Sequence, residues 1–406
     1  MDKTRPKLER VRRSVRNVQG FTVSGIDAGL RAYFGRPPSP DLSLIAADRP
    51  CTAAGVFTTN LVKAAPVLLD QARLQANPTS IRAVLVNTAT ANACTGDEGL
   101  RNAAQQAEWV AEGLGCKPEE VLVMSTGVIG VQLPMTQMQA GIPAAVAALR
   151  PDGWADAAKA IMTTDTQPKM ATIELDTIMI TGIAKGAGMI APNMATLLSV
   201  IATDAVIAPN LLQRALNEAV ERSFNCIVVD GDMSTNDTLL VLASGASGIE
   251  ITEDKLERFT GCLSAVCISL AQGLVKDAEG ASKFITLQVI GAHTAHEAHQ
   301  IANTIATSPL VKTAFYGGDA NWGRILAAAG RAGVPLDQSK LSLWYDDLQL
   351  VADGTPLDYD QDRANAIAAQ PEVNVRLNLG LGNQEATVWT CDLTHDYVDI
   401  NGHYRT

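Results

Sequence analysis

Apolar and polar positions alternate, or group into short β-rich blocks, along much of the chain, and both patterns are typical of β-strands. The segments with this pattern are Ala83–Asn87, Val121–Ser125, Ile173–Thr181, Phe284–Ile290, Leu341–Val351, Val373–Leu379 and Ala386–Cys391. Apolar residues recur at helical spacing in Pro209–Phe224, Asp254–Lys276 and Thr294–Lys312. Strands and helices are interleaved without strict alternation, and the end of the chain is mostly strand. The pattern predicts a layered α/β or α+β fold.

The amount of apolar sequence indicates two packed lobes. The chain has 406 residues, of which 47% are hydrophobic, and this is more than a single compact domain usually needs. Leu149–Gly153 and the glycine-rich run Lys185–Gly188 both interrupt the periodic pattern, but neither resembles a flexible linker. Neither segment therefore fixes a boundary between the lobes.

Charge and cysteine usage narrow the class of partner. The formal net charge is -11 and aromatic residues make up 4%, which does not suit the basic, aromatic-rich groove of a nucleic-acid-binding protein. The seven cysteines lack CxxC spacing, as expected of reduced thiols in a cytosolic protein. The basic N-terminal segment lacks the apolar stretch of a signal peptide, and no stretch approaches the ~20 consecutive apolar residues of a membrane helix. We expect a cytoplasmic protein that acts on small molecules, without nucleic-acid or membrane partners.

Two motifs suggest metal ligands and are discounted. His293, His296 and His299 recur every three residues in HTAHEAH, but no nearby cysteine or carboxylate pattern completes a zinc set. The segment Gly231–Asp237 has several oxygen-bearing side chains without the spacing of a calcium loop. We therefore expect a solvated helix face at the histidines, and no metal.

The segment from Ile178 to Val200 carries the strongest chemical signal. It reads IMITGIAKGAGMIAPNMATLLSV, a strand and a glycine-rich turn, then a threonine that starts a second apolar run. On its own the turn is better explained as a sharp connection between two strands, in which the glycines serve only the backbone. Thr196, however, begins a run that predicts a strand entering the core, so its position would be rigidly fixed.

A threonine hydroxyl needs a base beside it to act as a nucleophile, and an N-terminal amine on the same residue supplies one. Cleavage of the peptide bond before Thr196 would create that amine. Ala195 is small, which leaves room for the hydroxyl to attack the Ala195 carbonyl through a five-membered ring. The bond between Ala195 and Thr196 is therefore a candidate site of self-processing.

The sequence KGAGMIAPNMATLL resembles the processing motif of the arginine-biosynthesis glutamate N-acetyltransferase/ornithine acetyltransferase family. Further blocks agree in order: Cys51–Pro66, Asn92–Gly99, Ser125–Gly130, Thr163–Lys169, Asp230–Thr238, Asp277–Phe284, Val311–Ile325 and Asn401–Thr406. The resemblance covers nearly all of the chain from Gly20 onward. It implies a two-lobed, self-cleaved acetyltransferase fold of the N-terminal-nucleophile type. Fragment 1–195 would carry the oxyanion-hole loop, and fragment 196–406 would begin with the nucleophile.

The resemblance also implies the site residues. Thr196 would be the nucleophile of both self-cleavage and a ping-pong acetyl transfer, and Thr126 and Gly127 match the oxyanion-stabilising pair. The residues that match substrate-binding positions are Thr163, Lys185, Thr196, Glu279, Asn401 and Thr406. The TTDT block leaves the choice between Thr163 and Thr164 open. Lys185 suits the α-carboxylate that both amino-acid substrates carry, and Glu279 suits the side-chain amine of ornithine.

The implied reaction moves acetyl from N2-acetylornithine to glutamate, without a cofactor. Some members of the family also use acetyl-CoA as the donor, and the sequence leaves that choice open. The fragments are expected to stay together as a heterotetramer that contains two copies of each fragment, because separating them would expose strand edges. Two alternatives remain: an N-terminal-nucleophile aminopeptidase or amidase with the same cleavage site, and a non-enzymatic binding protein that is not cleaved.

The sequence departs from the family pattern in two places. The tail reads NGHYRT where NADYRT is more frequent, which puts a glycine and His403 beside Asn401. The block that begins at Asn87 reads NTATANACTG where NSGNANACTG is more usual. The first departure touches the expected substrate wall, and the second touches a loop to which the sequence assigns no role.

Overall fold

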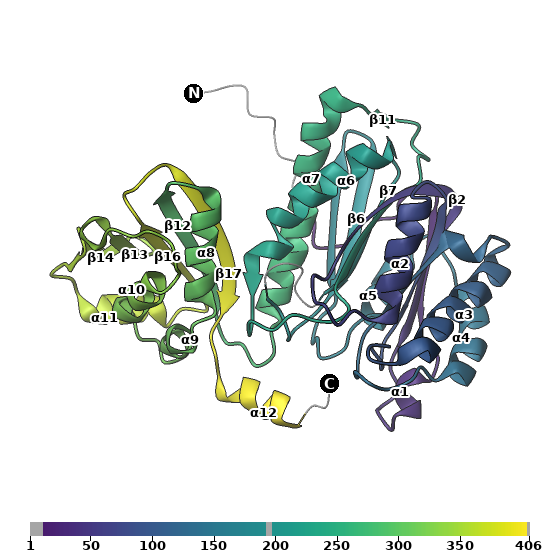
Figure 1. Ribbon diagram of the computed structural model, residues 1–406, viewed down its shortest axis with the longest axis horizontal. Coiled ribbons are helices and arrows are strands. Elements are labelled where there is room, and N and C mark those ends of the chain that lie inside the picture. Colours follow the sequence, from purple (N-terminus) through teal and green to yellow (C-terminus); the bar gives the residue numbers. More distant parts are fainter. Residues whose placement is uncertain (1–10, 192–196, 404–406) are drawn as a thin grey trace.

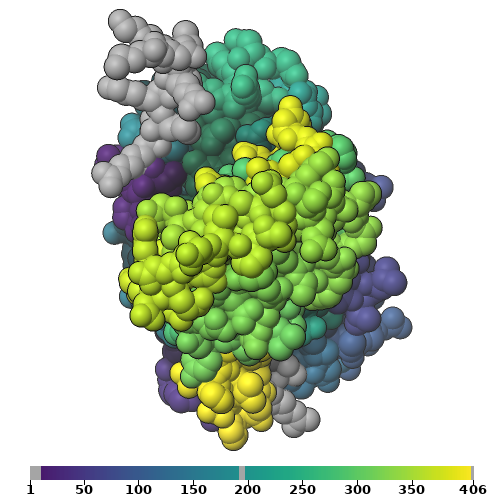
Figure 2. Space-filling model, turned by 90° about the vertical axis from the view of Figure 1, so that its left-hand side faces the viewer, coloured from purple at the N-terminus to yellow at the C-terminus, as the bar shows by residue number. Residues whose placement is uncertain are grey.

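The computed structural model of this protein describes residues 11–191 and 197–403, and within these ranges the chain forms two lobes (Figure 1). The larger lobe contains most elements from β1 to α7, and the smaller lobe contains those from β12 to β17. The last helix, α12 (His395–His403), leaves the smaller lobe and turns back toward the larger one. In Figure 2, which looks onto the smaller lobe, this helix lies at one end of the molecule. The expected two-lobed, layered α/β fold is confirmed.

The larger lobe is built on an eight-stranded sheet in which the strand order is β4-β3-β2-β10-β7-β6-β5, with β1 beside β2. Its strands are β1 (Phe21–Ile26), β2 (Leu42–Phe57), β3 (Ile81–Asn87), β4 (Val121–Ser125), β5 (Lys169–Leu175), β6 (Ile178–Lys185), β7 (Leu198–Thr203) and β10 (Thr238–Ala243). A separate two-stranded ribbon pairs β8 (Val206–Ile207) with β11 (Glu250–Ile251).

The long strand β2 belongs to both halves of this sheet. Its first half pairs with β1 and β3, its second half pairs with β10, and the β2/β3 register shifts between Ala46 and Cys51. Apolar side chains from the inner faces of both halves form one core with Trp154 of α5 (Trp154–Ala160), which is fully buried. The sheet therefore folds over itself into two stacked layers.

Helices cover the outer faces of both layers. Two of them pack on the β5–β7 half, namely α6 (Pro209–Glu221) and α7 (Glu253–Lys276). The other half carries α3 (Gly96–Leu114) and α4 (Met135–Ala147), and the remaining helices are α1 (Leu30–Tyr33) and α2 (Ala65–Ala76). By length and composition α7 could cross a membrane, but most of its apolar window is buried against β5, β6 and α6 as a core helix. The lobe is thus a four-layer α-β-β-α sandwich.

The smaller lobe has one sheet, ordered β15-β14-β13-β16-β12-β17-β9, with helices on one face. Along β16 (Glu372–Asn378) buried and exposed residues alternate, because only one face is covered. The other strands are β9 (Ile227–Val228), β12 (Phe284–Ala292), β13 (Ser342–Tyr345), β14 (Leu348–Ala352), β15 (Thr355–Pro356) and β17 (Gln384–Cys391). The helices are α8 (Ala295–Ala306), α9 (Pro309–Tyr316), α10 (Trp322–Gly330) and α11 (Gln361–Ala368).

Two of the predicted strands are hairpins. Ile173–Thr181 spans the turn between β5 and β6, and Leu341–Val351 spans the turn between β13 and β14. Asp176 and Asp346 occupy these turns with φ of 55° and 47°, in the left-handed region that aspartate tolerates. The single-strand predictions were wrong because apolar residues continue on both sides of each turn.

The predicted helix Thr294–Lys312 is two helices. It breaks between α8 and α9 at Ser308, because Pro309 has no N–H to continue the hydrogen-bond ladder and restricts the residue before it. The interruption at Leu149–Gly153 is a turn between α4 and α5 inside the larger lobe, so it marks no boundary.

The expected fragment boundary does not coincide with the division into lobes. Ala195 and Thr196 lie outside the described residues, but the strands on either side, β6 and β7, are antiparallel neighbours in the same sheet. Their register runs from Ile180 opposite Thr203 to Lys185 opposite Leu198. Fragments 1–195 and 196–406 would therefore share one sheet, and backbone hydrogen bonds would hold them together.

Candidate active site

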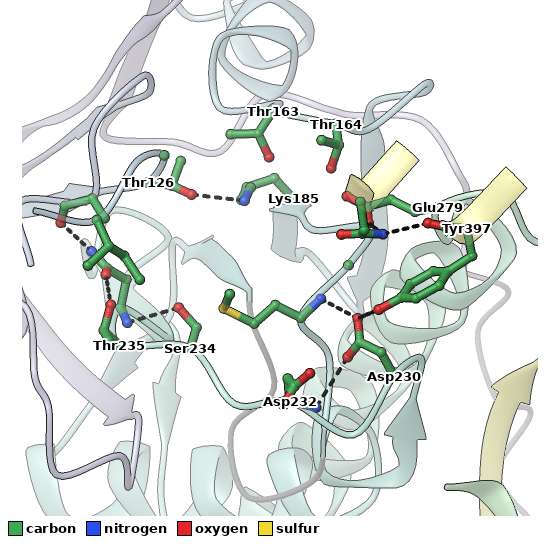
Figure 3. A pocket seen from close by; sticks show the side chains of 17 residues that line it. Thr126, Thr163, Thr164, Lys185, Asp230, Asp232, Ser234, Thr235, Glu279 and Tyr397 are labelled. Atoms are coloured by element: carbon green, nitrogen blue, oxygen red, sulfur yellow. Dashed lines mark hydrogen bonds between the residues drawn. The ribbon is translucent and has the colours of Figure 1, made fainter. Parts of the chain in front are cut away.

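One pocket brings together residues from seven separate segments of the sequence (Figure 3). All of the described candidate residues line it: Thr126, Gly127, Thr163, Lys185, Glu279 and Asn401. Thr164 lines it as well, so the geometry does not choose between the two threonines. The remaining candidates, Ala195, Thr196 and Thr406, lie outside the described residues.

The turn that contains Thr126 and Gly127 follows β4 directly and rests on the loop after β3. The Thr126 N–H donates to the Asn87 carbonyl over 3.0 Å. Gly127 has a φ of 134°, and a Cβ at this position would lie 2.3 Å from the carbonyl carbon of Ala89. Only glycine permits this approach, so the turn is fixed against the β3 loop.

The β3 loop, to which the sequence assigned no role, therefore supports this turn. The Val128 N–H donates to the Ala89 carbonyl over 3.1 Å, and the buried Asn236 amide donates to the Ala91 and Ser125 carbonyls over 2.6 and 2.8 Å. Ala89 has a φ of 87°, in the region that favours glycine, where a non-glycine residue costs roughly 1–2 kcal/mol. This is the position at which the family pattern more often has glycine.

Lys185, at the end of β6, supplies a buried positive charge beside the turn. Its side chain is nearly inaccessible, and Nζ donates to Thr126 Oγ1 over 3.0 Å. Burial lowers the pKa of Lys185, and the nearby carboxylate of Asp165 opposes that effect most strongly. Since the Thr126 oxygen accepts from Lys185, its hydroxyl hydrogen is available to donate to a ligand.

Glu279 forms another wall of the pocket. Its backbone N–H donates to the Ala187 carbonyl over 2.9 Å, and its Oε2 accepts from Nδ2 of Asn401 over 2.8 Å. The same Asn401 Nδ2 donates to the Tyr397 carbonyl over 3.0 Å. Helix α12 thus places an amide on the Glu279 carboxylate.

Asp230 fixes α12 to the glycine-rich turn. The Tyr397 hydroxyl donates to Asp230 Oδ2 over 3.2 Å, and the same carboxylate accepts the N–H groups of Met189 and Ile190 over 2.6 and 2.8 Å. Burial raises the pKa of Asp230. The tail differs from the family pattern at His403. The His403 ring contacts the Asp399 carbonyl within its own helix and does not replace the contacts of Asn401 with Glu279 and Tyr397.

Most of the other residues that line the pocket were not among the candidates identified from the sequence. Residues Asp230, Asp232, Ser234, Thr235 and Asn236 line the pocket, although the segment Gly231–Asp237, which contains four of them, was discounted as a calcium loop. The signal that could have found them is the match of block Asp230–Thr238 to the family. At its end, buried Asp237 accepts the Leu197 N–H over 3.0 Å, and burial raises its pKa well above the usual range.

The pocket suits a ligand that carries a negatively charged carboxylate and a positively charged amine. The Lys185 ammonium and the Thr126 hydroxyl offer donors to a carboxylate or a developing oxyanion, and Glu279 offers an acceptor to an amine (Figure 3). Among the described residues, no group of three or more His, Cys, Asp or Glu side chains could hold a metal ion. At the discounted histidines, His299 contacts the Asn225 carbonyl over 2.9 Å.

Comparison with known proteins adds a family relationship. The ArgJ family model matches residues 22–406. The arginine biosynthesis bifunctional protein ArgJ of Symbiobacterium thermophilum is 48% identical over 394 residues, which cover 95% of this chain and 97% of that protein. The protein of the same name from Geobacter sulfurreducens is 46% identical over 398 residues, 96% of this chain and 100% of that protein.

A solved structure is also similar in sequence. The ornithine acetyltransferase of Mycobacterium tuberculosis, crystallised with ornithine, is 40% identical, and the match covers 47% of this chain and 99% of that chain with a TM-score of 0.42.

Proposed function

This chain belongs to the ArgJ family of arginine-biosynthesis enzymes, and we propose on that premise that it moves acetyl from N2-acetylornithine to glutamate through acetyl-Thr196. The observation that carries the proposal is the single pocket lined by Thr126, Lys185, Glu279 and Asn401, which lie far apart in the sequence. The pocket offers donors for an α-carboxylate and an acceptor for a side-chain amine. The exchange needs no cofactor, because acetyl passes between two amino acids.

The proposed first half-reaction acetylates the enzyme. The Thr196 hydroxyl attacks the acetyl carbonyl of N2-acetylornithine, and the free α-amine of the same residue takes the hydroxyl proton. The oxyanion accepts hydrogen bonds at the Thr126–Gly127 turn. The C–N bond to ornithine then breaks, and the α-nitrogen of ornithine receives the proton as it leaves.

In the second half-reaction, the glutamate α-amine attacks the acetyl ester and loses its proton to the Thr196 amine. The ester C–O bond then breaks, the Thr196 oxygen takes that proton from the amine, and N-acetylglutamate leaves. An aminopeptidase or amidase would use water in this step. The transferase is favoured by Lys185, the buried cation available to the α-carboxylate that donor and acceptor share.

Self-cleavage and assembly are also part of the proposal. Cleavage between Ala195 and Thr196 would free the amine, and the β6/β7 pairing supports continued association of the fragments. We further propose a cytoplasmic heterotetramer of two fragments 1–195 and two fragments 196–406. Light scattering of the purified protein, with denaturing electrophoresis of the same sample, tests both points.

A steady-state assay with acetylornithine and glutamate tests the function directly. The account predicts equimolar release of ornithine and N-acetylglutamate, with parallel double-reciprocal plots at several fixed glutamate concentrations. Release of acetate that does not depend on glutamate would support the hydrolase instead. A protein that binds acetylornithine without any turnover would support the binding protein.

Substitutions of Lys185 and Glu279 are expected to affect the half-reactions differently. Lys185→Met should weaken both by about ten- to a hundredfold in apparent affinity, since both amino acids carry the α-carboxylate. Glu279→Gln should impair acetylation by acetylornithine more than discharge by glutamate, which has no side-chain amine. Rapid-quench measurement of each half-reaction checks both. Equal losses in both steps for Glu279→Gln would remove the assignment of Glu279.

Gly188→Ala should reproduce the Glu279 effect without touching that residue. A Cβ at Gly188 would lie 2.3 Å from Glu279 Oε2. Since this carboxylate is the free end of a flexible side chain, it should move and lose its bond to Asn401 at little cost in stability. We expect about a tenfold rise in KM for acetylornithine and a melting temperature close to that of the wild type.

The matched control for this variant is Gly261→Ala. Gly261 lies in α7, where a Cβ would meet nothing within 4 Å. This control should keep the wild-type KM. A wild-type KM in Gly188→Ala as well would mean that the position of the Glu279 carboxylate is not important for acetylornithine.

A further inference from the structure

Three charged side chains form a buried cluster behind the pocket, and none of them is among the residues that line it. Lys169 Nζ lies 2.5 Å from Asp165 Oδ1 and 2.5 Å from Asp277 Oδ2. The Lys169 and Asp165 side chains are only 4% and 0% exposed. Because buried ion pairs often stabilise a fold no better than apolar residues of similar size, the cluster is weak evidence of a stabilising role.

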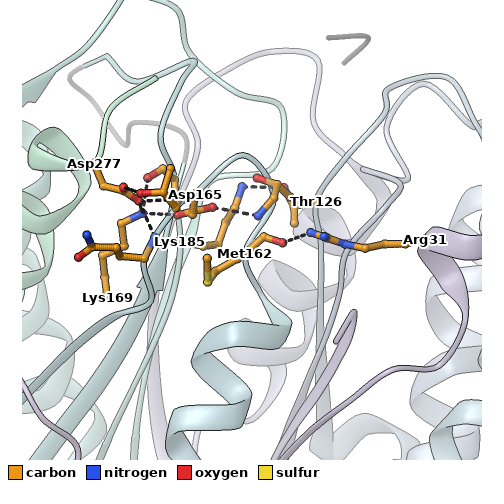
Figure 4. Close-up of polar contacts among 11 residues, drawn as sticks. Arg31, Thr126, Met162, Asp165, Lys169, Lys185 and Asp277 are labelled. Atoms are coloured by element: carbon orange, nitrogen blue, oxygen red, sulfur yellow. Dashed lines mark hydrogen bonds and ion pairs between the residues drawn. The ribbon is translucent and has the colours of Figure 1, made fainter. Parts of the chain in front are cut away.

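Each carboxylate of the cluster holds a segment that carries pocket residues (Figure 4). Asp165 accepts the Thr163 N–H over 2.9 Å and the Gly186 N–H over 2.7 Å. Asp277 accepts the backbone N–H groups of Thr166 and Gln167 over 3.0 and 3.2 Å. The cluster therefore joins the threonine block, the residue after Lys185, and the end of α7.

The charged groups that face Lys185 are Asp165, Lys169, Asp237 and Glu279. Lys169 opposes a charge on Lys185. Asp237 is fully buried, burial raises its pKa well above the usual range, and it supports the Lys185 charge less than Asp165 does. Glu279 is only half-buried, which weakens its field by solvent screening. Asp165, by contrast, is buried, and its pKa is lowered despite burial because Lys169 and Lys185 both stabilise its charge.

We propose that Asp165, which also pairs with Lys169, is a positioning residue for Lys185, keeping its amine charged and fixing its direction through the hydrogen bond to Gly186. Asp165 lies between the two lysine side chains (Figure 4). It acts on the substrate through Lys185. The inference rests on the proposed function, since it takes Lys185 as the partner of the α-carboxylate.

The test is the pH dependence of KM for acetylornithine. Its readout is the pH midpoint, which is the pH at which KM has doubled from its value at neutral pH. Loss of the Lys185 charge at high pH should raise KM. Asp165→Asn removes the supporting charge at nearly constant size, and should move this pH down by about one unit or more. Lys169→Met removes the opposing charge and should move it up. A merely loosened scaffold would shift both variants in the same direction, or neither.

Asp277→Asn is the matched control. It takes away the other carboxylate partner of Lys169, but Asp277 is not among the charged neighbours of Lys185. The control should therefore keep the wild-type pH midpoint, even if its melting temperature falls. Where Asp165→Asn fails to fold, the comparison of Lys169→Met with Asp277→Asn decides: an upward shift confined to Lys169→Met supports the inference, and equal midpoints overturn it.

Lys185→Met separates this inference from the proposed function. If that variant has the wild-type KM at every pH, the carboxylate-binding role of Lys185 fails, and the inference fails with it. If Lys185→Met raises KM and removes the midpoint, while Asp165→Asn and Lys169→Met both keep it, only the positioning role of Asp165 is overturned.

Discussion

The Thr196→Ala variant is expected to remain a single full-length chain with acetyl transfer reduced by at least about 10⁴-fold. Without the hydroxyl there is no attack on the Ala195 carbonyl, so no free amine forms. The same hydroxyl is also the proposed acetyl carrier, and its loss therefore removes both reactions. Denaturing electrophoresis and the steady-state assay on one preparation measure the two effects together.

Thr196→Ser is the matched control, because serine keeps a hydroxyl and can still generate an N-terminal amine. It should cleave and turn over more slowly than the wild type, but far above the alanine variant. Wild-type turnover in Thr196→Ala would rule out this residue as the acetyl carrier, whatever its cleavage state.

The second large effect is expected from Thr126→Val. Valine keeps the shape of threonine but cannot donate a hydrogen bond, so the oxyanion loses one donor and kcat should fall by about 100- to 1,000-fold. Lys185 also loses its 3.0 Å acceptor, so a smaller rise in KM should accompany the fall in kcat. Single-turnover acetylation by acetylornithine separates the two quantities.

Thr126→Ser restores the hydroxyl and should recover most of the activity. A kcat within about twofold of the wild type in Thr126→Val, with normal folding, would show that the hydroxyl does not stabilise the oxyanion.

Regular, half-buried elements could be predicted from the sequence because burial on one face leaves a periodic trace. Val373–Leu379 was placed to within one residue of β16 at each end, and α7 was placed to within one residue at its start. Val121–Ser125 is buried throughout and was found only as a short β-rich block. Strands buried on both faces leave no such trace. Every residue of β10, Thr238–Ala243, is buried, and β2 changes partners midway, so neither strand was predicted.

The candidate site could be predicted only as separate blocks. Glu279 and Lys185 were singled out because the blocks that contain them match the family pattern. That Asn401 would reach Glu279, or that Asp165 would lie between two lysines, depends on packing across the lobe. Asp230 shows the same limit, since its partners are the glycine-rich turn and the last helix.

The central claim is the acetyl-Thr196 intermediate, and mass spectrometry of the enzyme after incubation with N2-acetylornithine alone tests it most directly. The account predicts that fragment 196–406 gains the mass of one acetyl group, located on its first residue, with one ornithine released per site. Addition of glutamate should then remove the acetyl group as N-acetylglutamate. Ornithine release from an enzyme that carries no acetyl group at Thr196, at any time before glutamate is added, would contradict the account.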